Sequence, residues 1–295
     1  MNRRNGKTSR EVGLELAAIC GKHFFKLEHL HYGYWTDDLE VDISNLHKAQ
    51  ENYTNFLVSH IPDGVTTILD VGCGAGQTAK KLVGGGYHVD CVSPSPFLSK
   101  RVRLLLENTS HIFECPYEQL EMEDRYDVIL FSESFQYIPL QKALERTFRF
   151  LKDDGYLLIC DFFKRDIKGN SMLGGGHELK KFYELIAHYP FQPVADLDIT
   201  DKTAPNLDIF DSAVKNVGQP ALDLGLTFLS GRYPLTVKFL RWKYRKRINK
   251  VCNKYFNGGR TSEDFKRSKA YRLFLYKKIR PNITWKMGEN FKSIN

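Results

Sequence analysis

Short apolar runs alternate with amphipathic segments over residues 66–163, and this alternation predicts strands and helices in turn. The apolar runs are rich in β-branched residues and are bounded by Gly, Pro or Asp. The predicted strands lie at 66–71, 87–92, 111–115, 126–132 and 156–163. The predicted helices lie at 75–83, 96–108 and 140–154. Strict alternation requires right-handed crossovers, so we expect a doubly wound, mostly parallel α/β sheet.

The same pattern continues after this region. It predicts a helix over 177–189 and two further strands over 191–199 and 270–278. The segment 203–263 between those strands is mostly helical, and about 60 residues are too many for a simple loop. We therefore expect three parts: a helical lid segment at 1–60, an α/β core at 61–202 plus 264–280, and an inserted basic helical cap at 203–263.

Composition narrows the setting of the protein. Hydrophobic residues are 42% of the 295 positions, yet no run approaches the ~20 apolar residues of a membrane-spanning helix. The start of the chain is basic, but its apolar stretch is broken by Glu15 and is too short for a secretory signal. The six cysteines are scattered without a CxxC pair, so we expect a reduced, cytoplasmic chain without a metal site.

Charge is distributed unevenly along the chain. Residues 201–295 carry 21 Lys and Arg against 7 Asp and Glu, whereas residues 1–200 carry 22 against 28. The basic run RWKYRKRINK, at 241–250, falls in the predicted cap. A solvated helix face, peripheral contact with an anionic membrane, and attraction of an acidic acceptor or nucleic acid all explain such a run. Nucleic acid is unlikely, because no RNA-binding module precedes the core.

The most specific motif is ILDVGCGAGQ at 68–77, where a predicted strand ends and a helix begins. Gly72, Gly74 and Gly76 permit a sharp turn and let a ligand approach the backbone closely. A generic glycine turn is one explanation. A dinucleotide site is another, but it requires G-x-G-x-x-G, and Asp70 would repel a pyrophosphate. The same carboxylate suits a cationic amino-acid group.

With these residues the chain resembles the class I S-adenosylmethionine-dependent methyltransferases, whose first motif is an acid followed by G-x-G-x-G. The resemblance covers residues 66–199 in order. It implies a Rossmann-like, seven-stranded sheet with an antiparallel last strand, and S-adenosyl-L-methionine as the cofactor. It also implies that Asp70, Gly72, Gly74 and Gly76 hold the methionine half of that cofactor.

Two departures from the common pattern resemble one branch of the class, the cyclopropane-fatty-acid-synthase, tocopherol and sarcosine methyltransferase group. Ser93 stands where the class usually has a ribose-binding acid, and CPYEQL replaces the common G-D-A before the fourth strand. By this resemblance Ser93 lies near the ribose, Tyr117 flanks the adenine, and Glu118 accepts from the adenine amino group. Leu98 stands where the branch often has Gln, which leaves one polar contact without a counterpart.

The end of the fourth strand, FSESFQYIP, matches the place where the branch faces the sulfonium and the acceptor. The matching positions are Ser132, Glu133, Gln136 and Tyr137. We expect Ser132 beside the cofactor, and Glu133 and Tyr137 as acid–base or orienting groups. The alternative is that Glu133 caps the following helix and Tyr137 belongs to the core.

Aromatic residues crowd the stretch EHLHYGYW at 28–35. In the resembling branch such an element closes over the cofactor, which implies a lid made by Tyr32, Tyr34 and Trp35. Aromatic faces attract a sulfonium cation, by about 0.5–2 kcal/mol when water is excluded. The alternative is an amphipathic segment that packs on the domain. No metal-ligand motif accompanies the two histidines of this stretch.

The predicted function is methyl transfer to an O, N or C atom of a small or lipid-like acceptor, by in-line displacement. Aromatic residues of the cap are expected to line the acceptor pocket: Phe228, Tyr233, Phe239, Tyr255 and Phe256. An RNA or protein methyltransferase and a non-catalytic ligand-binding relative are the alternatives. A basic groove leading to the methyl group would favour RNA, and a closed aromatic pocket would favour a small molecule.

Overall fold

The computed structural model describes residues 21, 28–107, 109–167, 173–255 and 260–280. Within them seven strands form a sheet in the order β3-β2-β1-β4-β5-β7-β6. Their bounds are β1 Thr67–Val71, β2 His88–Val92, β3 Ile112–Phe113, β4 Tyr126–Ser132, β5 Leu151–Lys164, β6 Phe191–Asp198 and β7 Lys269–Lys278. The neighbouring strands β3, β2, β1, β4 and β5 pair in parallel, in this order across the sheet. Strand β7 runs antiparallel to both β5 and β6. The predicted sheet is therefore confirmed.

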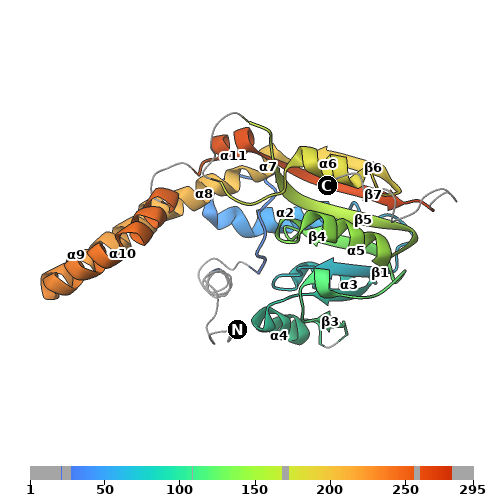
Figure 1. Ribbon diagram of the computed structural model, residues 1–295, viewed down its shortest axis with the longest axis horizontal. Helices are drawn as coiled ribbons and strands as arrows, with labels where there is room; N and C mark the ends of the chain where they lie inside the picture. Colours follow the sequence, from blue (N-terminus) through green and yellow to red (C-terminus); the bar gives the residue numbers. More distant parts are fainter. Residues whose placement is uncertain (1–20, 22–27, 108, 168–172, 256–259, 281–295) are drawn as a thin grey trace.

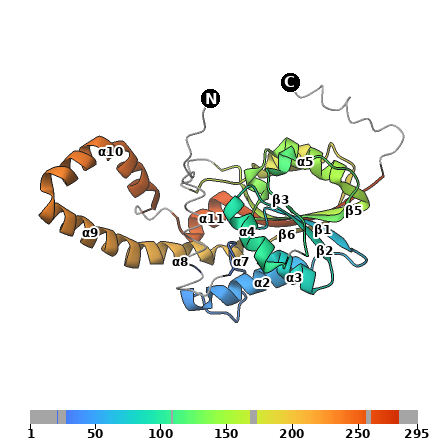
Figure 2. The same cartoon turned by 90° about the horizontal axis from the view of Figure 1, so that it is seen from below.

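Helices cover both faces of this sheet. The α-helices are α2 Leu46–Val58, α3 Gln77–Gly84, α4 Pro96–Leu105, α5 Leu140–Phe150, α6 Leu179–Ile186, α7 Thr200–Thr203, α8 Pro205–Ala213, α9 Gln219–Arg232, α10 Pro234–Tyr255 and α11 Ser262–Ser268. The short elements are η1 Ile43–Asn45, η2 Tyr117–Gln119, η3 Phe135–Tyr137 and the π-turn η4 Val214–Gly218. Figure 2 shows α5 on one side of the sheet, with α2 and α3 on the other.

The period of two along the central strand explains the two cores. In β4 the side chains of Val128 and Leu130 pack into the core beneath α2, α3 and α4. Those of Ile129 and Phe131 pack into the core beneath α5 and α6. All four are fully buried, because alternate residues of a strand point to opposite faces.

Helix α5 is shorter than its apolar pattern predicts. The predicted helix ran to Asp154, but α5 ends at Phe150 and β5 begins at Leu151. Leu151 pairs with Tyr126 of β4, and Asp154 has a φ of +63°, which a right-handed helix cannot accommodate. The strand pairing therefore overrides the helical periodicity of these residues.

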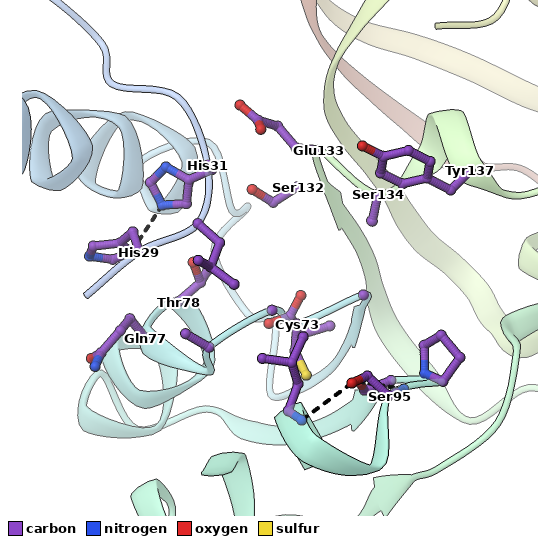
Figure 3. Close-up of a pocket in the computed structure, with 18 residues that line it drawn as sticks. His29, His31, Cys73, Gln77, Thr78, Ser95, Ser132, Glu133, Ser134 and Tyr137 are labelled. Carbon is purple, nitrogen blue, oxygen red and sulfur yellow. Dashed lines mark hydrogen bonds between the residues drawn. The ribbon is translucent and has the colours of Figure 1, made fainter. Parts of the chain in front are cut away.

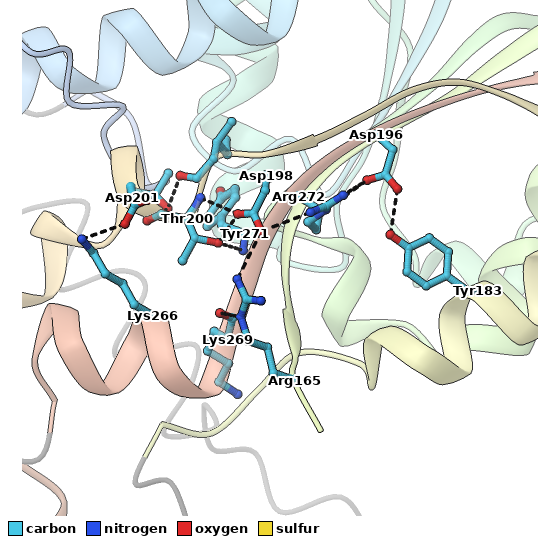
Figure 4. Close-up of polar contacts among 12 residues, drawn as sticks. Arg165, Tyr183, Asp196, Asp198, Thr200, Asp201, Lys266, Lys269, Tyr271 and Arg272 are labelled. Carbon is cyan, nitrogen blue, oxygen red and sulfur yellow. Dashed lines mark hydrogen bonds and ion pairs between the residues drawn. The ribbon is translucent and has the colours of Figure 1, made fainter. Parts of the chain in front are cut away.

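Polar contacts attach the last strand to the edge of the sheet (Figure 4). The Arg272 guanidinium of β7 contacts Asp196 and Asp198 of β6, with an Nη1–Oδ2 distance of 3.1 Å to Asp198. The Tyr271 amide donates to Thr200 Oγ1 at 2.8 Å. Since Thr200 begins α7, this bond ties the start of the helical insertion to β7.

The inserted segment is helical as predicted, but it does not cover the body as a cap. Helix α8 still contributes the buried residues Asn206 and Leu207 to the body. Helices α9 and α10 then form an arm that projects beyond the sheet (Figure 1). We call residues 219–255 the arm; no residue of 219–249 is buried. The aromatic side chains expected to line a pocket are therefore exposed at Phe228, Tyr233 and Phe239, while those of Tyr255 and Phe256 lie outside the described side chains.

The N-terminal part is only partly helical. Residues 28–42 run without a regular helix, and α2 follows η1. The predicted helical structure at 1–20 and 22–27 lies outside the described residues.

Candidate cofactor site

A cavity of about 330 Å³ lies at the carboxyl ends of β1, β2 and β4. Strand β1 has β2 on one side and β4 on the other, so the strand order reverses here. Ligands of open α/β sheets bind at such a switch point, in pockets of roughly 300–1,000 Å³. The lining residues are His29, Leu30, His31, Asp70, Gly72, Cys73, Gly74, Ala75, Gln77, Thr78, Ser93, Pro94, Ser95, Leu98, Ser132, Glu133, Ser134 and Tyr137.

The three glycines of the loop serve different purposes, although all have positive φ values. A Cβ on Gly72 would lie 2.5 Å from the Cβ of Ser134, and one on Gly76 would lie 3.1 Å from Val102 Cγ2. These two glycines therefore permit close packing of the protein against itself. A Cβ on Gly74 would meet nothing nearer than Leu30, at 3.9 Å, and Gly74 lines the cavity. Gly74 is the position that leaves space for a ligand.

Asp70 lines the cavity, and one oxygen of its carboxyl group has no hydrogen-bond partner among the described residues. The residue is buried at the penultimate position of β1, and burial raises its pKa to about 7. Its Oδ2 has no hydrogen-bond partner among the described residues. A buried polar atom without a partner is costly, and a cationic ligand group in the cavity would satisfy it. The predicted acid–glycine pair thus has the chemistry needed for the amino group of S-adenosylmethionine.

Glu133 follows β4 in a strained conformation, with a φ of +52°. Its Oε1 accepts a hydrogen bond from the Tyr32 amide at 2.7 Å and another from the Tyr271 hydroxyl at 2.7 Å. Burial raises the pKa of this carboxyl to about 8, and the two hydrogen bonds oppose that shift in part. Both bonds hold the side chain toward the N-terminal segment and β7, so Glu133 does not cap the helix that follows it.

A buried chain of hydroxyl groups continues behind Glu133. The Tyr271 hydroxyl also lies 3.0 Å from the hydroxyl of Tyr53 on α2. Tyr53 in turn donates to the Cys160 carbonyl at 3.1 Å and lies 3.3 Å from Ser132 Oγ. Tyr53 and Tyr271 could not be predicted as partners from the sequence, because 218 positions separate them and no local pattern connects them.

The other predicted strand-end residues occupy the cavity wall with one exception. Figure 3 shows Ser132 and Glu133 between His31 on one side and Tyr137 on the other. Tyr137 is largely exposed, so it is not a core residue. Ser93 lines the cavity at the end of β2. Gln136 lies outside the lining, and its Nε2 donates to Asp161 Oδ1 at 3.0 Å.

The structure contradicts the predicted place of Tyr117 beside an adenine. Tyr117 is buried in the core beneath α5, with its ring edge-to-face against Phe131 and Phe150. Its hydroxyl lies 3.0 Å from Thr147 Oγ1, which satisfies the buried polar group. Glu118 is half-buried, and it too lies outside the lining of the cavity.

The predicted aromatic lid is also corrected, because its three side chains pack on the body. Tyr34 stacks on Phe56 of α2 at a centroid distance of 4.8 Å, and Trp35 is buried. Tyr32 packs near Phe265, with ring centroids 6.1 Å apart. None of Tyr32, Tyr34 and Trp35 lines the cavity, so the alternative of a packing segment describes these rings.

His29 and His31 take the place that the tyrosines were expected to fill. His31 Nδ1 lies 2.8 Å from the Tyr32 carbonyl and donates to it, so His31 Nε2 accepts from His29 Nδ1 at 2.9 Å. Burial lowers the pKa of His31 to about 3, which keeps the ring neutral. Their alternate positions in an extended segment could have indicated that they share one side.

Several further lining residues were not predicted from the sequence, namely Cys73, Ala75, Gln77, Thr78, Ser95 and Ser134. Three of them directly follow a glycine and Thr78 comes one position later, and this position was the available signal for them.

Comparison with known proteins agrees with this geometry. Residues 69–159 match the methyltransferase-domain family. These residues are thus similar to a methyltransferase domain. The family match includes the carboxyl end of β1, the glycine loop and β4, which contribute to the cavity.

The individual relatives of this chain are distant in sequence. A ubiquinone biosynthesis O-methyltransferase of Rickettsia bellii is 26% identical over 153 residues, which cover 49% of this chain and 63% of the relative. The chain thus spans less than two thirds of the length of that relative.

Solved structures match over nearly the whole chain. The [4+2]-cyclase SpnF has a TM-score of 0.64 at 16% identity, covering 94% of this chain and 98% of its own. A geranyl diphosphate C-methyltransferase from Streptomyces coelicolor A3(2) has a TM-score of 0.63 at 15% identity, covering 94% and 100%. At such identities these structures show a shared fold.

Proposed function

We propose that the chain transfers the methyl group of S-adenosylmethionine to an O, N or C atom of a small or lipid-like acceptor. The observation that carries this proposal is the cavity between the unsatisfied oxygen of Asp70 and the strand-end carboxyl of Glu133. S-adenosylmethionine supplies, when bound, a methyl group activated by its positively charged sulfur. The residues of this chain then have to bind the cofactor, orient the acceptor and exclude water.

The glycine-loop side of the cavity would hold the cofactor. Asp70 Oδ2 would accept from the ammonium group, and the open space at Gly74 would admit the methionine half against the backbone. Ser93 and Ser95 present hydroxyl groups on the β2 side of the cavity, where ribose hydroxyls could be bound.

The Glu133 side would orient the acceptor. The two hydrogen bonds of Glu133 both use Oε1, which leaves Oε2 for a hydroxyl or amine of the acceptor. A carboxyl with a pKa of about 8 can take a proton near neutral pH. Most of the rate enhancement would still come from alignment and exclusion of water.

A second candidate is a ligand-binding or non-methylating role for the same cavity. Its support is the fold shared with the structure named as a [4+2]-cyclase. An RNA methyltransferase has less support. The basic residues of 241–249 contribute nothing to the described lining, so they form no basic groove into the cavity.

Gly74→Val tests the cofactor site, with Gly64→Val as a matched control. Gly64 also has a positive φ, +78°, but no atom lies within 4 Å of its Cβ position, and it is outside the cavity. Both variants should therefore lose similar stability, about 1–3 kcal/mol from backbone strain. Calorimetry should show S-adenosylhomocysteine affinity at least about tenfold weaker in Gly74→Val only, because one valine occupies ligand space.

Wild-type affinity in a folded Gly74→Val protein would overturn the cofactor assignment. Methyl transfer itself is tested separately, with isotopically labelled S-adenosylmethionine and a lipid and metabolite extract. Tight binding without any labelled product would favour the second candidate.

A further inference from the structure

The arm combines positive charge with exposed apolar surface. Residues 219–249 carry seven Lys and Arg against a single acid, Asp223. The cations are Arg232, Lys238, Arg241, Lys243, Arg245, Lys246 and Arg247. Within the described part of the chain none of the seven forms an ion pair with the body or with Asp223. Their charge is therefore available to an external partner.

The apolar side chains of the arm fall into two sets along each helix. On α10, Leu240, Tyr244 and Ile248 recur at intervals of four and are 40–44% exposed. Leu235 and Trp242 are 81% and 73% exposed, and Phe239 lies between them on the same face.

Helix α9 repeats this arrangement. Leu222 and Leu229 are less exposed, whereas Leu224 and Phe228 are 74% and 68% exposed. The outer positions of both helices thus present five large apolar side chains: Leu224, Phe228, Leu235, Phe239 and Trp242. Exposed apolar side chains gathered on two successive helices indicate an interaction site.

We propose that the arm docks on the surface of an anionic phospholipid membrane. The outer apolar side chains would enter the boundary between headgroups and acyl chains, while Lys and Arg extend to the phosphates. Trp242 suits this boundary because its ring is apolar and its N–H is polar. None of the described helices is long and apolar enough to cross a membrane, so the arm would lie on the surface.

Charge favours this occupant over the two main rivals. A second copy of the chain would bring two arms of the same strong positive charge together, which is unfavourable. A nucleic acid would satisfy the cations but would leave the aliphatic side chains Leu224 and Leu235 in water. Outside residues 219–255 the chain carries 34 basic against 34 acidic residues, so an anionic surface would attract the arm far more strongly than the body.

Vesicle sedimentation with the full chain tests the proposal. The probes are vesicles of phosphatidylcholine alone and of phosphatidylcholine with 30% phosphatidylglycerol. Binding should require the anionic lipid and should weaken as salt rises from about 50 to 500 mM, because screening shortens the reach of surface charge. Changing Arg241, Lys243, Arg245, Lys246 and Arg247 to Gln should weaken binding by at least about tenfold.

A matched pair separates the apolar contribution from general surface effects. Leu224→Asp on the arm and Leu104→Asp on α4 of the body alter side chains that are equally exposed, at 74%. Leu224→Asp should weaken vesicle binding several-fold, whereas Leu104→Asp should not. Trp242 fluorescence should be quenched by brominated phosphatidylcholine mixed into the anionic vesicles, and Trp242→Phe should remove that quenching.

The proposal goes beyond the proposed function and can fail independently of it. All arm variants should keep the wild-type affinity for S-adenosylhomocysteine, because no arm residue lines the cavity among the described residues. Absence of wild-type binding to anionic vesicles would overturn the proposal. So would equal losses in Leu224→Asp and Leu104→Asp. Arm-dependent dimers in light scattering, or RNA binding without vesicle binding, would assign the surface to another occupant.

Discussion

Asp70 and Glu133 are carboxyl groups whose pKa values burial raises on two sides of one cavity. Asp70 lacks a partner for Oδ2, whereas Glu133 receives two hydrogen bonds on one oxygen. A protein that only needed stability would not retain such groups, because burial of an acid disfavours its charged form. At the scale of single residues, these two positions are therefore the sharpest tests of function.

Asp70→Asn is expected to stabilise the ligand-free protein at pH 8 by about 1–3 kcal/mol, because a native pKa raised above its unfolded value destabilises the ionised protein. The native pKa is about 7, against a reference value of 3.8. The penalty is therefore absent below about pH 4, grows as the pH rises to 7, and is complete above it. Urea unfolding at pH 4 and pH 8 measures the difference.

The same Asp70→Asn variant should bind S-adenosylhomocysteine at least about tenfold more weakly, since the ammonium loses a charged acceptor. Greater stability together with weaker binding would separate a functional carboxylate from a structural one. A variant less stable than wild type at pH 8 would contradict the account of Asp70.

Glu133 predicts a rising pH profile for turnover. Because its pKa is about 8, the proton-accepting form increases as the pH rises from 6 to 9. Glu133→Gln should lower kcat by about 10²–10⁴-fold and flatten this profile, with little change in cofactor affinity. Tyr271→Phe removes a hydrogen bond that lowers the pKa of Glu133, so its profile should shift to higher pH. Steady-state kinetics with the identified acceptor, measured from pH 6 to 9, would check both variants. A pH profile of kcat in Tyr271→Phe that is identical to wild type would mean that Glu133 has no role in proton transfer.

At the scale of elements, the segment 28–36 has two halves with different surroundings. Residues 29–31 line the cavity, whereas the next residues are tied to the body by their backbone. The Gly33 amide donates to Asn206 Oδ1 at 2.8 Å, and the Tyr34 amide donates to the Ala49 carbonyl at 2.7 Å. One short element thus combines a wall of the cavity with an anchor in the core.

Hydrogen exchange across residues 28–36 should reveal this division. Adding S-adenosylhomocysteine should slow exchange at the amides of 29–31, which the ligand covers, and leave the hydrogen-bonded amides of 33–35 almost unchanged. Slowing that is confined to 33–35 would instead restore the aromatic lid expected from the sequence. The exchange rates at 33–35 in the ligand-free protein serve as the internal control, since they should already be low.

At the scale of the whole molecule, the basic arm projects from an α/β body whose charges balance, with 34 Lys and Arg against 34 Asp and Glu outside residues 219–255. The arm leaves from the sheet edge formed by β6 and β7, and it contributes no residue to the cavity among those described. The proposed membrane contact would therefore position the molecule without altering its cofactor site. This division explains why arm and cavity variants are expected to have independent effects.

Local patterns were enough to predict much of this protein. The alternation of apolar runs and helical segments over 66–163 predicted a doubly wound sheet, and the glycines after its first strand predicted a ligand site. Asp70, Ser93, Glu133 and Tyr137 were selected because they stand at strand ends that match motifs of the resembling methyltransferases, and all four line the cavity. Such features are readable because strand direction alone decides which edge these residues occupy.

Contacts between distant segments decided the rest. Tyr271 reaches Glu133 from 138 positions away, and Tyr117 turns into the core to meet Thr147. The aromatic rings of residues 32–35 pack against side chains of α2 and β7. The histidines at 29 and 31 therefore line the cavity in their place. The insertion formed helices from local propensity, but whether they covered the body or projected from it depended on side-chain packing against the sheet. Propensity and periodicity describe a residue's neighbours along the chain, whereas burial and hydrogen bonding depend on partners that only the folded chain brings together.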